Sequence, residues 1–72
     1  MILDCTGQRC PQPVIELARA AKRGHMGQTI RITTDDPAAV IDIPAWCRMR
    51  GQECTVVAET DGLITHEVTL RR

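Results

Sequence analysis

The stretch 28–37, QTIRITTDDP, contains a strand pattern followed at once by a helix start. Ile30 and Ile32 alternate with polar residues, which is typical of a β-strand with one buried face. The acidic pair before Pro37 is typical of a helix N-cap with proline in the first turn. The sequence therefore predicts a strand over 28–34 that leads into a helix beginning near Pro37.

Downstream of this stretch, the chain predicts the rest of the helix and then a β-hairpin. The apolar positions of the helix recur at three- and four-residue spacing: Val40, Ile43, Trp46 and Cys47. Gly51 is expected to end the helix, and Pro44 either to kink it or to mark the start of its second half. Two strand segments follow at 54–59 and 63–70, and the Asp-Gly pair at 61–62 favours a tight turn between them.

Upstream, a short extended segment over 2–5 is broken by Gly7, and a helical pattern begins at Pro11 and ends at Gly24. Its apolar positions follow helical spacing: Val14, Leu17, Ala18 and Ala21. The element order is therefore β-α-β-α-β-β within a single domain over 1–72. The predicted fold class is α+β, a two-layer sandwich in which a four-stranded mixed sheet carries both helices on one face.

Length and composition narrow the possible functions. A domain of 72 residues buries only about 60% of the surface of its unfolded chain, which is too little to enclose a deep pocket and keep a core. Chemistry is therefore expected on an exposed edge, as in a carrier or a binding module. Nine basic residues balance nine acidic ones and Trp46 is the only aromatic, so neither phosphate binding nor base stacking is favoured. We expect no direct nucleic-acid partner.

The start of the chain lacks the basic and apolar segments of a secretory signal, and no apolar run approaches the ~20 residues of a membrane span. We expect a cytoplasmic protein without membrane contact, where thiols are kept reduced. Four cysteines are present but no C-x-x-C pair, and the two histidines are not at zinc-ligand spacing. The cysteines are expected to be buried or to serve sulfur or redox chemistry, with neither a metal nor a cofactor.

The segment 7–13, GQRCPQP, places a cysteine at a predicted helix start. Cys10 is expected at the N-cap, with Pro11 at the first helical position, where its missing N–H costs nothing. Pro13 at the third position removes another donor, which leaves the Gln12 N–H as the natural donor to the Cys10 sulfur. The two prolines also stiffen this end of the helix.

This position is expected to lower the pKa of Cys10. A helix N-terminus favours negative charge by about 0.3–1 kcal/mol, and one pKa unit corresponds to about 1.4 kcal/mol. A fall of roughly one unit from a free-cysteine pKa near ~8.5 raises the thiolate fraction at pH ~7.5 from about a tenth to about a half. Arg9 beside it favours the thiolate further, and the thiolate is the form that attacks a sulfur donor. The alternative, a purely structural N-cap, is less favoured because Cys is a poor cap.

The other cysteines have simpler interpretations. Cys47 lies on the apolar stripe of the second helix, and Cys54 shares a strand face with other small apolar residues, so both are expected to pack. Cys5 is also expected in the core. The alternative is that Cys5 lies close enough to Cys10 to resolve a persulfide as a disulfide.

The acidic and histidine side chains are expected to be structural. Asp35 and Asp36 are expected to cap the second helix and not to bind a metal. His66 alternates with apolar residues on one strand face, so we expect it on the sheet, whereas His25 lies in a Gly-rich loop and is expected in solvent.

The motifs of this chain resemble those of the TusA-like, or SirA-like, sulfur carriers, whose signature is Leu-Asp…Gly…Cys-Pro-x-Pro followed by a second acidic-proline block. The matching positions are Leu3-Asp4, Gly7, Cys10-Pro11-Gln12-Pro13, Asp35-Asp36-Pro37-Ala38, Asp42-Ile43-Pro44 and Asp61-Gly62. The resemblance covers nearly the whole chain without insertions. One position departs from the pattern, because Gln8 stands where Leu is common, and this change affects the expected docking surface.

The resemblance implies a β-α-β-α-β-β sandwich and a persulfide on Cys10, supported by Arg9, Pro11, Gln12 and Pro13. It implies a sulfur donor protein, either a cysteine desulfurase or a rhodanese. It also implies an acceptor protein in tRNA thiolation, molybdenum-cofactor synthesis or sulfur oxidation. A monomer that forms transient complexes and has no independent turnover suits this role.

Two other functions compete with sulfur carriage. A thiol oxidoreductase needs a resolving cysteine, usually in C-x-x-C, and proline follows Cys10 instead. A non-catalytic regulatory or interaction module would keep the fold without the chemistry. Five basic residues lie on the two predicted helices: Arg19, Lys22, Arg23, Arg48 and Arg50. They are expected by default to form a solvated face. The functional alternative is a docking surface for acidic partners, which would make association salt-sensitive.

The pH dependence of Cys10 alkylation tests the electrostatic expectation. We expect the alkylation rate to reach half of its maximum about one pH unit below the free-cysteine pKa of ~8.5, because only the thiolate reacts. The rate is followed by mass spectrometry of the peptide that contains Cys10. A midpoint at about 8.5 or above would show that the helix start leaves the thiol unactivated.

Overall fold

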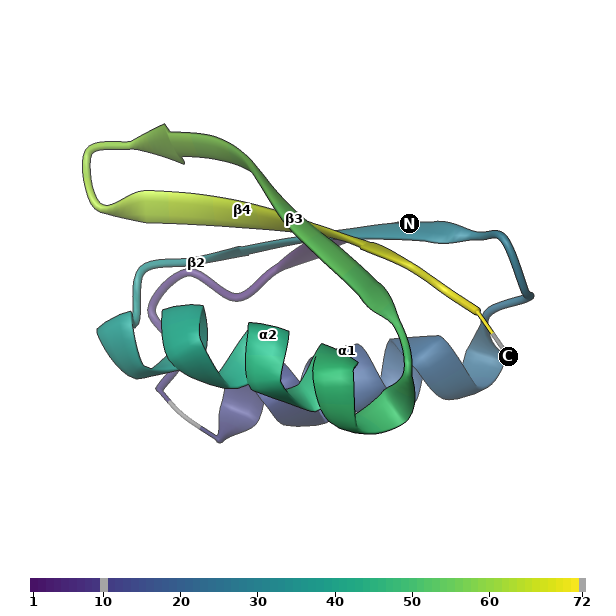
Figure 1. Cartoon of the computed structure of the whole chain (residues 1–72). Helices are drawn as coiled ribbons and strands as arrows, with labels where there is room; N and C mark the ends of the chain where they lie inside the picture. Colours follow the sequence, from purple (N-terminus) through teal and green to yellow (C-terminus); the bar gives the residue numbers. More distant parts are fainter. Residues whose placement is uncertain (10, 72) are drawn as a thin grey trace.

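The computed structural model describes residues 1–9 and 11–71, and its elements follow the order β-α-β-α-β-β. They are β1 (Ile2–Asp4), α1 (Gln12–Arg23), β2 (Thr29–Thr34), α2 (Pro37–Arg50), β3 (Glu53–Thr60) and β4 (Leu63–Thr69). Figure 1 shows the two helices side by side beneath one face of the sheet. The predicted two-layer α+β fold is confirmed.

The four strands form one mixed sheet in the order β1-β2-β4-β3. β1 pairs parallel with β2, and β4 pairs antiparallel with both β2 and β3. The β3–β4 hairpin closes through Asp61 and Gly62, both with positive φ (53° and 80°), between the paired residues Thr60 and Leu63. Two central residues with positive φ define a type I′ turn, which matches the twist of the flanking strands and confirms the turn expected from Asp-Gly.

The buried face of α1 differs slightly from the predicted stripe. Its fully buried residues are Pro13, Leu17 and Ala20. Val14, Ala18 and Ala21 are only half-buried, and Ala18 and Ala21 line a shallow space between α1 and the end of α2. The spacing of apolar residues therefore predicted the correct side of the helix but not the centre of its buried face. That centre depends on how the helix packs against both the sheet and the neighbouring helix.

The buried stripe of α2 consists of Ala39, Ile43 and Cys47, at four-residue spacing, while Val40 and Trp46 lie at its border. Pro44 stands inside the helix, which runs without interruption from Pro37 to Arg50. The expectation that Pro44 begins a separate second half is therefore wrong. The helix ends at Gly51, which has a positive φ of 71° as in an αL cap.

The buried hydrophobic core is made of aliphatic side chains and thiols. Its buried members are Cys5, Leu17, Ala20, Ile30, Ile32, Ala39, Ile43, Cys47, Val68 and Leu70. Close packing extends to the end of α1, where a Cβ built on Gly24 would come within 2.4 Å of the Leu70 Cδ1. Gly24 has an ordinary φ of −82°, so a larger residue there is opposed by the position of the Leu70 side chain, which would have to shift, and not by backbone conformation.

His66 is an unusual member of this interior. It lies in β4 between Ile32 and Val56 of the neighbouring strands, and its side chain is completely buried. Neither ring nitrogen has a hydrogen-bond partner among the described residues. Burial lowers the pKa of His66 below its ordinary value of 6.5, so the ring is held in its neutral form.

The depressed pKa of His66 predicts a loss of stability in acid. As the pH falls below ~6.5, the unfolded state takes up a proton that the folded state does not, so the free energy of unfolding should fall by up to about 1.4 kcal/mol per pH unit until the folded pKa is reached. Urea unfolding at a series of pH values measures this slope. His66→Leu should flatten it.

His25→Leu provides the matched control, because His25 is an exposed loop histidine. This variant should keep the acid slope of the unaltered protein. An equal slope in His66→Leu would contradict the assignment of acid sensitivity to the buried ring.

Candidate functional site

Residues 5–9, which we call the site loop, connect β1 to the segment before α1. The Gln8 N–H donates to the Cys5 carbonyl at 3.1 Å and closes a turn. Gly7 lies inside this turn with a φ of 83°, a conformation that L side chains rarely adopt. No heavy atom lies within 4 Å of a Cβ built on Gly7, so its backbone angle and not its surroundings requires glycine.

Two aspartates hold the site loop in place. The Thr6 N–H donates to the Asp4 Oδ1 at 3.0 Å, a local Asx turn. Hydrogen bonds from the Thr6 side chain and backbone lower the pKa of Asp4, so this carboxyl remains an anionic acceptor. The Gly7 N–H donates to the Asp35 Oδ1, also at 3.0 Å, and this bond joins residues that are 28 positions apart in the sequence.

The role of Asp35 corrects the sequence interpretation, which gave both aspartates to the cap of α2. Asp36 alone is the N-cap, and its Oδ1 accepts from the Ala38 N–H at 3.2 Å. Because Pro37 occupies the first turn, only the residue directly before it has the N-cap position. Asp35 therefore lies outside the cap and makes a tertiary contact with Gly7 instead.

The start of α1 also differs from the prediction. The helix begins at Gln12 with Pro11 as its N-cap, one residue later than expected. The Gln12 N–H donates to the Arg9 carbonyl at 2.8 Å. This bond closes a turn from Arg9 to Gln12 directly before the helix.

Cys10 itself lies outside the described residues, so the predictions of its position and contacts stay predictions. Its sequence neighbours Arg9 and Pro11 are both exposed. Pro13 is buried at the second helical position, where it anchors the start of α1 against the core. The positive end of the helix dipole is present whichever residue forms the cap, and the electrostatic expectation for a neighbouring thiol is therefore unchanged.

The remaining three cysteines pack in or against the core. Cys5 and Cys47 are each only 1% exposed, and Cys54 is half-buried against the core. Burial raises the pKa of Cys5, with smaller contributions from the Glu16 and Asp4 carboxylates. The structure thus confirms the expected packing of all three.

A shallow apolar groove lies next to the site loop. It is lined by Asp35, Pro37, Val40, Ile41, Gly62 and Ile64. The side chain of Ile41 is 71% exposed, and the Asp35 carboxylate connects the groove to the loop through Gly7. Exposed apolar surface beside a constrained loop is a common setting for contact with another protein.

The side chain of Gln8, the departure from the family signature, is half-buried. Its amide Oε1 is buried without a hydrogen-bond partner among the described residues. An unpartnered polar atom next to the site is costly unless another group reaches it. The sequence located this position but could not show that its amide is withdrawn from solvent.

Comparison with protein families matches residues 1–71 to the family described as Sulfurtransferase TusA. This chain belongs to the TusA family. Among solved structures, the SirA-like protein from Desulfitobacterium hafniense has a similar fold, with a TM-score of 0.87 at 23% identity over 100% of both chains. The fold is therefore shared even where most side chains differ.

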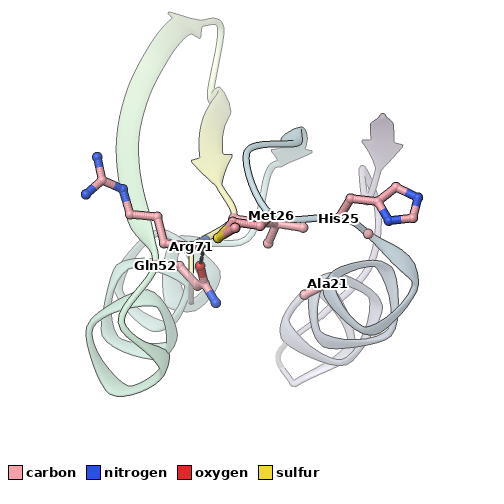
Figure 2. A pocket seen from close by; sticks show the side chains of 7 residues that line it. Ala21, His25, Met26, Gln52 and Arg71 are labelled. Atoms are coloured by element: carbon pink, nitrogen blue, oxygen red, sulfur yellow. Dashed lines mark hydrogen bonds between the residues drawn. The ribbon is translucent and has the colours of Figure 1, made fainter.

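The described part of this TusA-family chain shows no candidate metal centre. Among residues 1–9 and 11–71, no three histidine, cysteine or acidic side chains are grouped so that they could hold a metal ion. None of the helices in these ranges is long and apolar enough to cross a membrane. A concavity of about 410 Å³ is lined by residues such as His25, Met26 and Gln52 and contains no thiol (Figure 2).

Removing the Asp35 carboxylate should loosen the site loop. We expect Asp35→Ala to accelerate hydrogen exchange of the Gly7 amide by roughly tenfold or more, since a hydrogen bond to a charged acceptor contributes about 1.5–3 kcal/mol. Nuclear magnetic resonance follows the exchange. The Gly51 amide, which donates to the Arg48 carbonyl at the other end of α2, is the internal control and should not change. Equal exchange at Gly7 in both proteins would mean that the loop does not depend on Asp35.

Proposed function

We propose that this protein carries sulfane sulfur as a persulfide on Cys10 and passes it from a donor protein to an acceptor protein. The supporting observation is the distribution of cysteines. Cys5, Cys47 and Cys54 pack in or against the core, whereas Cys10 follows a constrained loop in the sequence and directly precedes the N-cap of α1. Membership of the TusA family supports sulfur transfer as the activity.

The proposed transfer is an exchange between sulfur atoms and consumes no oxidant. The Cys10 thiolate attacks the terminal sulfur of a donor persulfide, a new S–S bond forms, and the donor thiol leaves as the old S–S bond breaks. An acceptor thiolate then attacks the outer sulfur of the Cys10 persulfide. A new S–S bond forms on the acceptor, and Cys10 leaves as a thiolate when its own S–S bond breaks. Arg9 and the positive end of α1 favour the anionic sulfur at both stages.

Pro11, Gln12 and Pro13 are proposed to support the reaction by rigidity more than by direct contact. Pro11 and Pro13 restrict the backbone at the helix start. The Gln12 side chain donates from its Nε2 to the Glu16 Oε1 at 3.0 Å, along the helix. A stiff helix start presents the sulfur with little conformational freedom to lose on docking.

The partners are proposed to be a cysteine desulfurase or a rhodanese as donor, and an acceptor protein of tRNA thiolation, cofactor synthesis or sulfur oxidation. The apolar groove beside the site loop provides contact area for such a protein. Exposed basic side chains on both helices suit an acidic partner surface: Arg19, Lys22, Arg23, Arg48 and Arg50. We propose a cytoplasmic monomer that forms transient complexes and does not contact nucleic acid or membrane.

Intact-protein mass after incubation with a sulfur donor tests this function. Either desulfurase with cysteine or rhodanese with thiosulfate is supplied, and Cys10→Ser is compared with the unaltered protein. We expect a gain of one sulfur, about 32 Da, that reductant reverses and that is absent from the variant.

Cys54→Ser is the matched control, because it removes a cysteine that is packed against the core, and it should still gain one sulfur. No addition with either donor, in a folded protein, would favour the non-catalytic interaction module. Addition that persists in Cys10→Ser would assign the wrong cysteine.

A further inference from the structure

Two cysteines outside the site loop lie close together at the junction of α2 and β3. Cys47 is in the last turn of α2, and Cys54 is the second residue of β3. Cys47 is buried, and Cys54 is half-buried and packs against the same core cluster. Cys47 is about 16 Å along the helix axis from Asp36, so the pair is at the opposite end of α2 from the site loop.

The backbone between the two cysteines is fixed by a helix cap. The chain reverses at Gly51, and the Gln52 N–H then donates to the Cys47 carbonyl at 2.8 Å. The Gln52 side chain accepts a hydrogen bond from the Arg71 N–H (Figure 2), which also ties this junction to the end of the chain after β4. This junction therefore holds the start of β3 against the end of α2.

The strand register directs Cys54 toward Cys47. Cys54 is paired with Val68, whose side chain is fully buried. Because directly opposite residues in an antiparallel pair share a face, the Cys54 side chain points to the helix layer. The Cys47 thiol lies within hydrogen-bonding reach of the Cys54 sulfur and donates to it.

Both thiols are held in their protonated forms. Burial raises the pKa of Cys47 to about 12, with further contributions from the charge and the hydrogen bond of Cys54. Burial also raises the pKa of Cys54, while the hydrogen bond from Cys47 opposes the rise. The charges that act on Cys5 are those of Glu16 and Asp4, so no other pairing is indicated among the described cysteines.

We propose that Cys47 and Cys54 are an oxidation site that forms an intramolecular disulfide with a hydroperoxide, separate from sulfur carriage on Cys10. Cys54 is the partly accessible thiol and reacts first. Its sulfur attacks the peroxide, an S–O bond forms as the O–O bond breaks, and water or an alcohol leaves with the thiol proton. The Cys47 sulfur then attacks the sulfenic sulfur of Cys54, the S–O bond breaks, and water leaves as the S–S bond forms. Two thiols lose two electrons in total, and one hydroperoxide is reduced.

The Cys47–Cys54 disulfide should form slowly, and it should not interfere with sulfur transfer by Cys10. Raised thiol pKa values keep the thiolate fraction small near neutral pH, so the rate should increase about tenfold per pH unit below them. The linked residues belong to one junction, and within the described ranges neither is hydrogen-bonded to the site loop. Oxidation should therefore join α2 to β3 and leave the loop unchanged.

The experiment uses the full chain carrying Cys10→Ser, treated with hydrogen peroxide at neutral and alkaline pH. The protein is then denatured, its free thiols are alkylated, and it is digested with trypsin. We expect peptides 32–48 and 51–71 to be joined by a bond that reductant breaks. The intact mass should fall by about 2 Da before alkylation.

Two further variants in the same background define the pairing. Cys5→Ala should form the same link at the same rate, whereas Cys54→Ala should leave Cys47 unoxidised under identical treatment. A sulfinic acid on Cys54 beside an alkylated Cys47, or a link that includes Cys5, would overturn the proposal. The decisive result comes from the protein in which both cysteines are intact, so it does not depend on the folding of Cys54→Ala.

Discussion

The hydrogen bond from the Gly7 N–H to the Asp35 carboxylate, 3.0 Å long, joins the loop after β1 to the segment before α2. These segments lie 28 residues apart and approach each other because β1 and β2 are parallel neighbours, so their carboxyl ends lie at the same edge of the sheet. The position of the chain that leads into Cys10 therefore depends on the topology of the sheet.

The sheet and the helices that position the site loop are held together by a small core. The interior is composed of aliphatic residues and thiols, and the largest polar group in it is the neutral His66 ring. A methyl group at Gly24 would require the Leu70 side chain to shift. Because interiors of this density do not deform easily, the sheet and helices form a rigid base for the exposed loop. Binding and transfer then take place on the surface, as the small size of the domain requires.

The spacing of apolar residues, together with the residues typical of helix starts and turns, was sufficient to predict the fold from the sequence. The alternation in β2, the proline-initiated α2 and the Asp-Gly turn each specify local structure through a single physical rule, and all three were confirmed. The centres of the helix stripes were missed by about one residue, since they depend on how each helix packs against both the sheet and the other helix. The uninterrupted passage of α2 through Pro44 also depends on tertiary packing, which outweighs the local cost of proline.

The candidate site was located from the sequence, but its contacts were not. The break of the extended segment at Gly7 followed from residue type, whereas the prediction of Cys10 at a helix start concerns a residue outside the described ranges. The Asp35–Gly7 bond could not follow, because it joins distant segments, and the bond from the Gln12 amide to the Arg9 carbonyl was not anticipated. The Cys47–Cys54 neighbourhood likewise depends on the register of β3 with β4.

Delivery of sulfur is the step that separates a carrier from a protein that is merely modified. The direct measurement loads the protein with isotopically labelled sulfane sulfur, removes the donor, and follows the label after mixing with an acceptor protein in a single turnover. The account predicts that about one labelled sulfur per chain leaves Cys10 and appears as a persulfide on the acceptor, with no transfer from Cys10→Ser. Label that remains on the loaded protein, or that reaches the acceptor equally from Cys10→Ser, would contradict it.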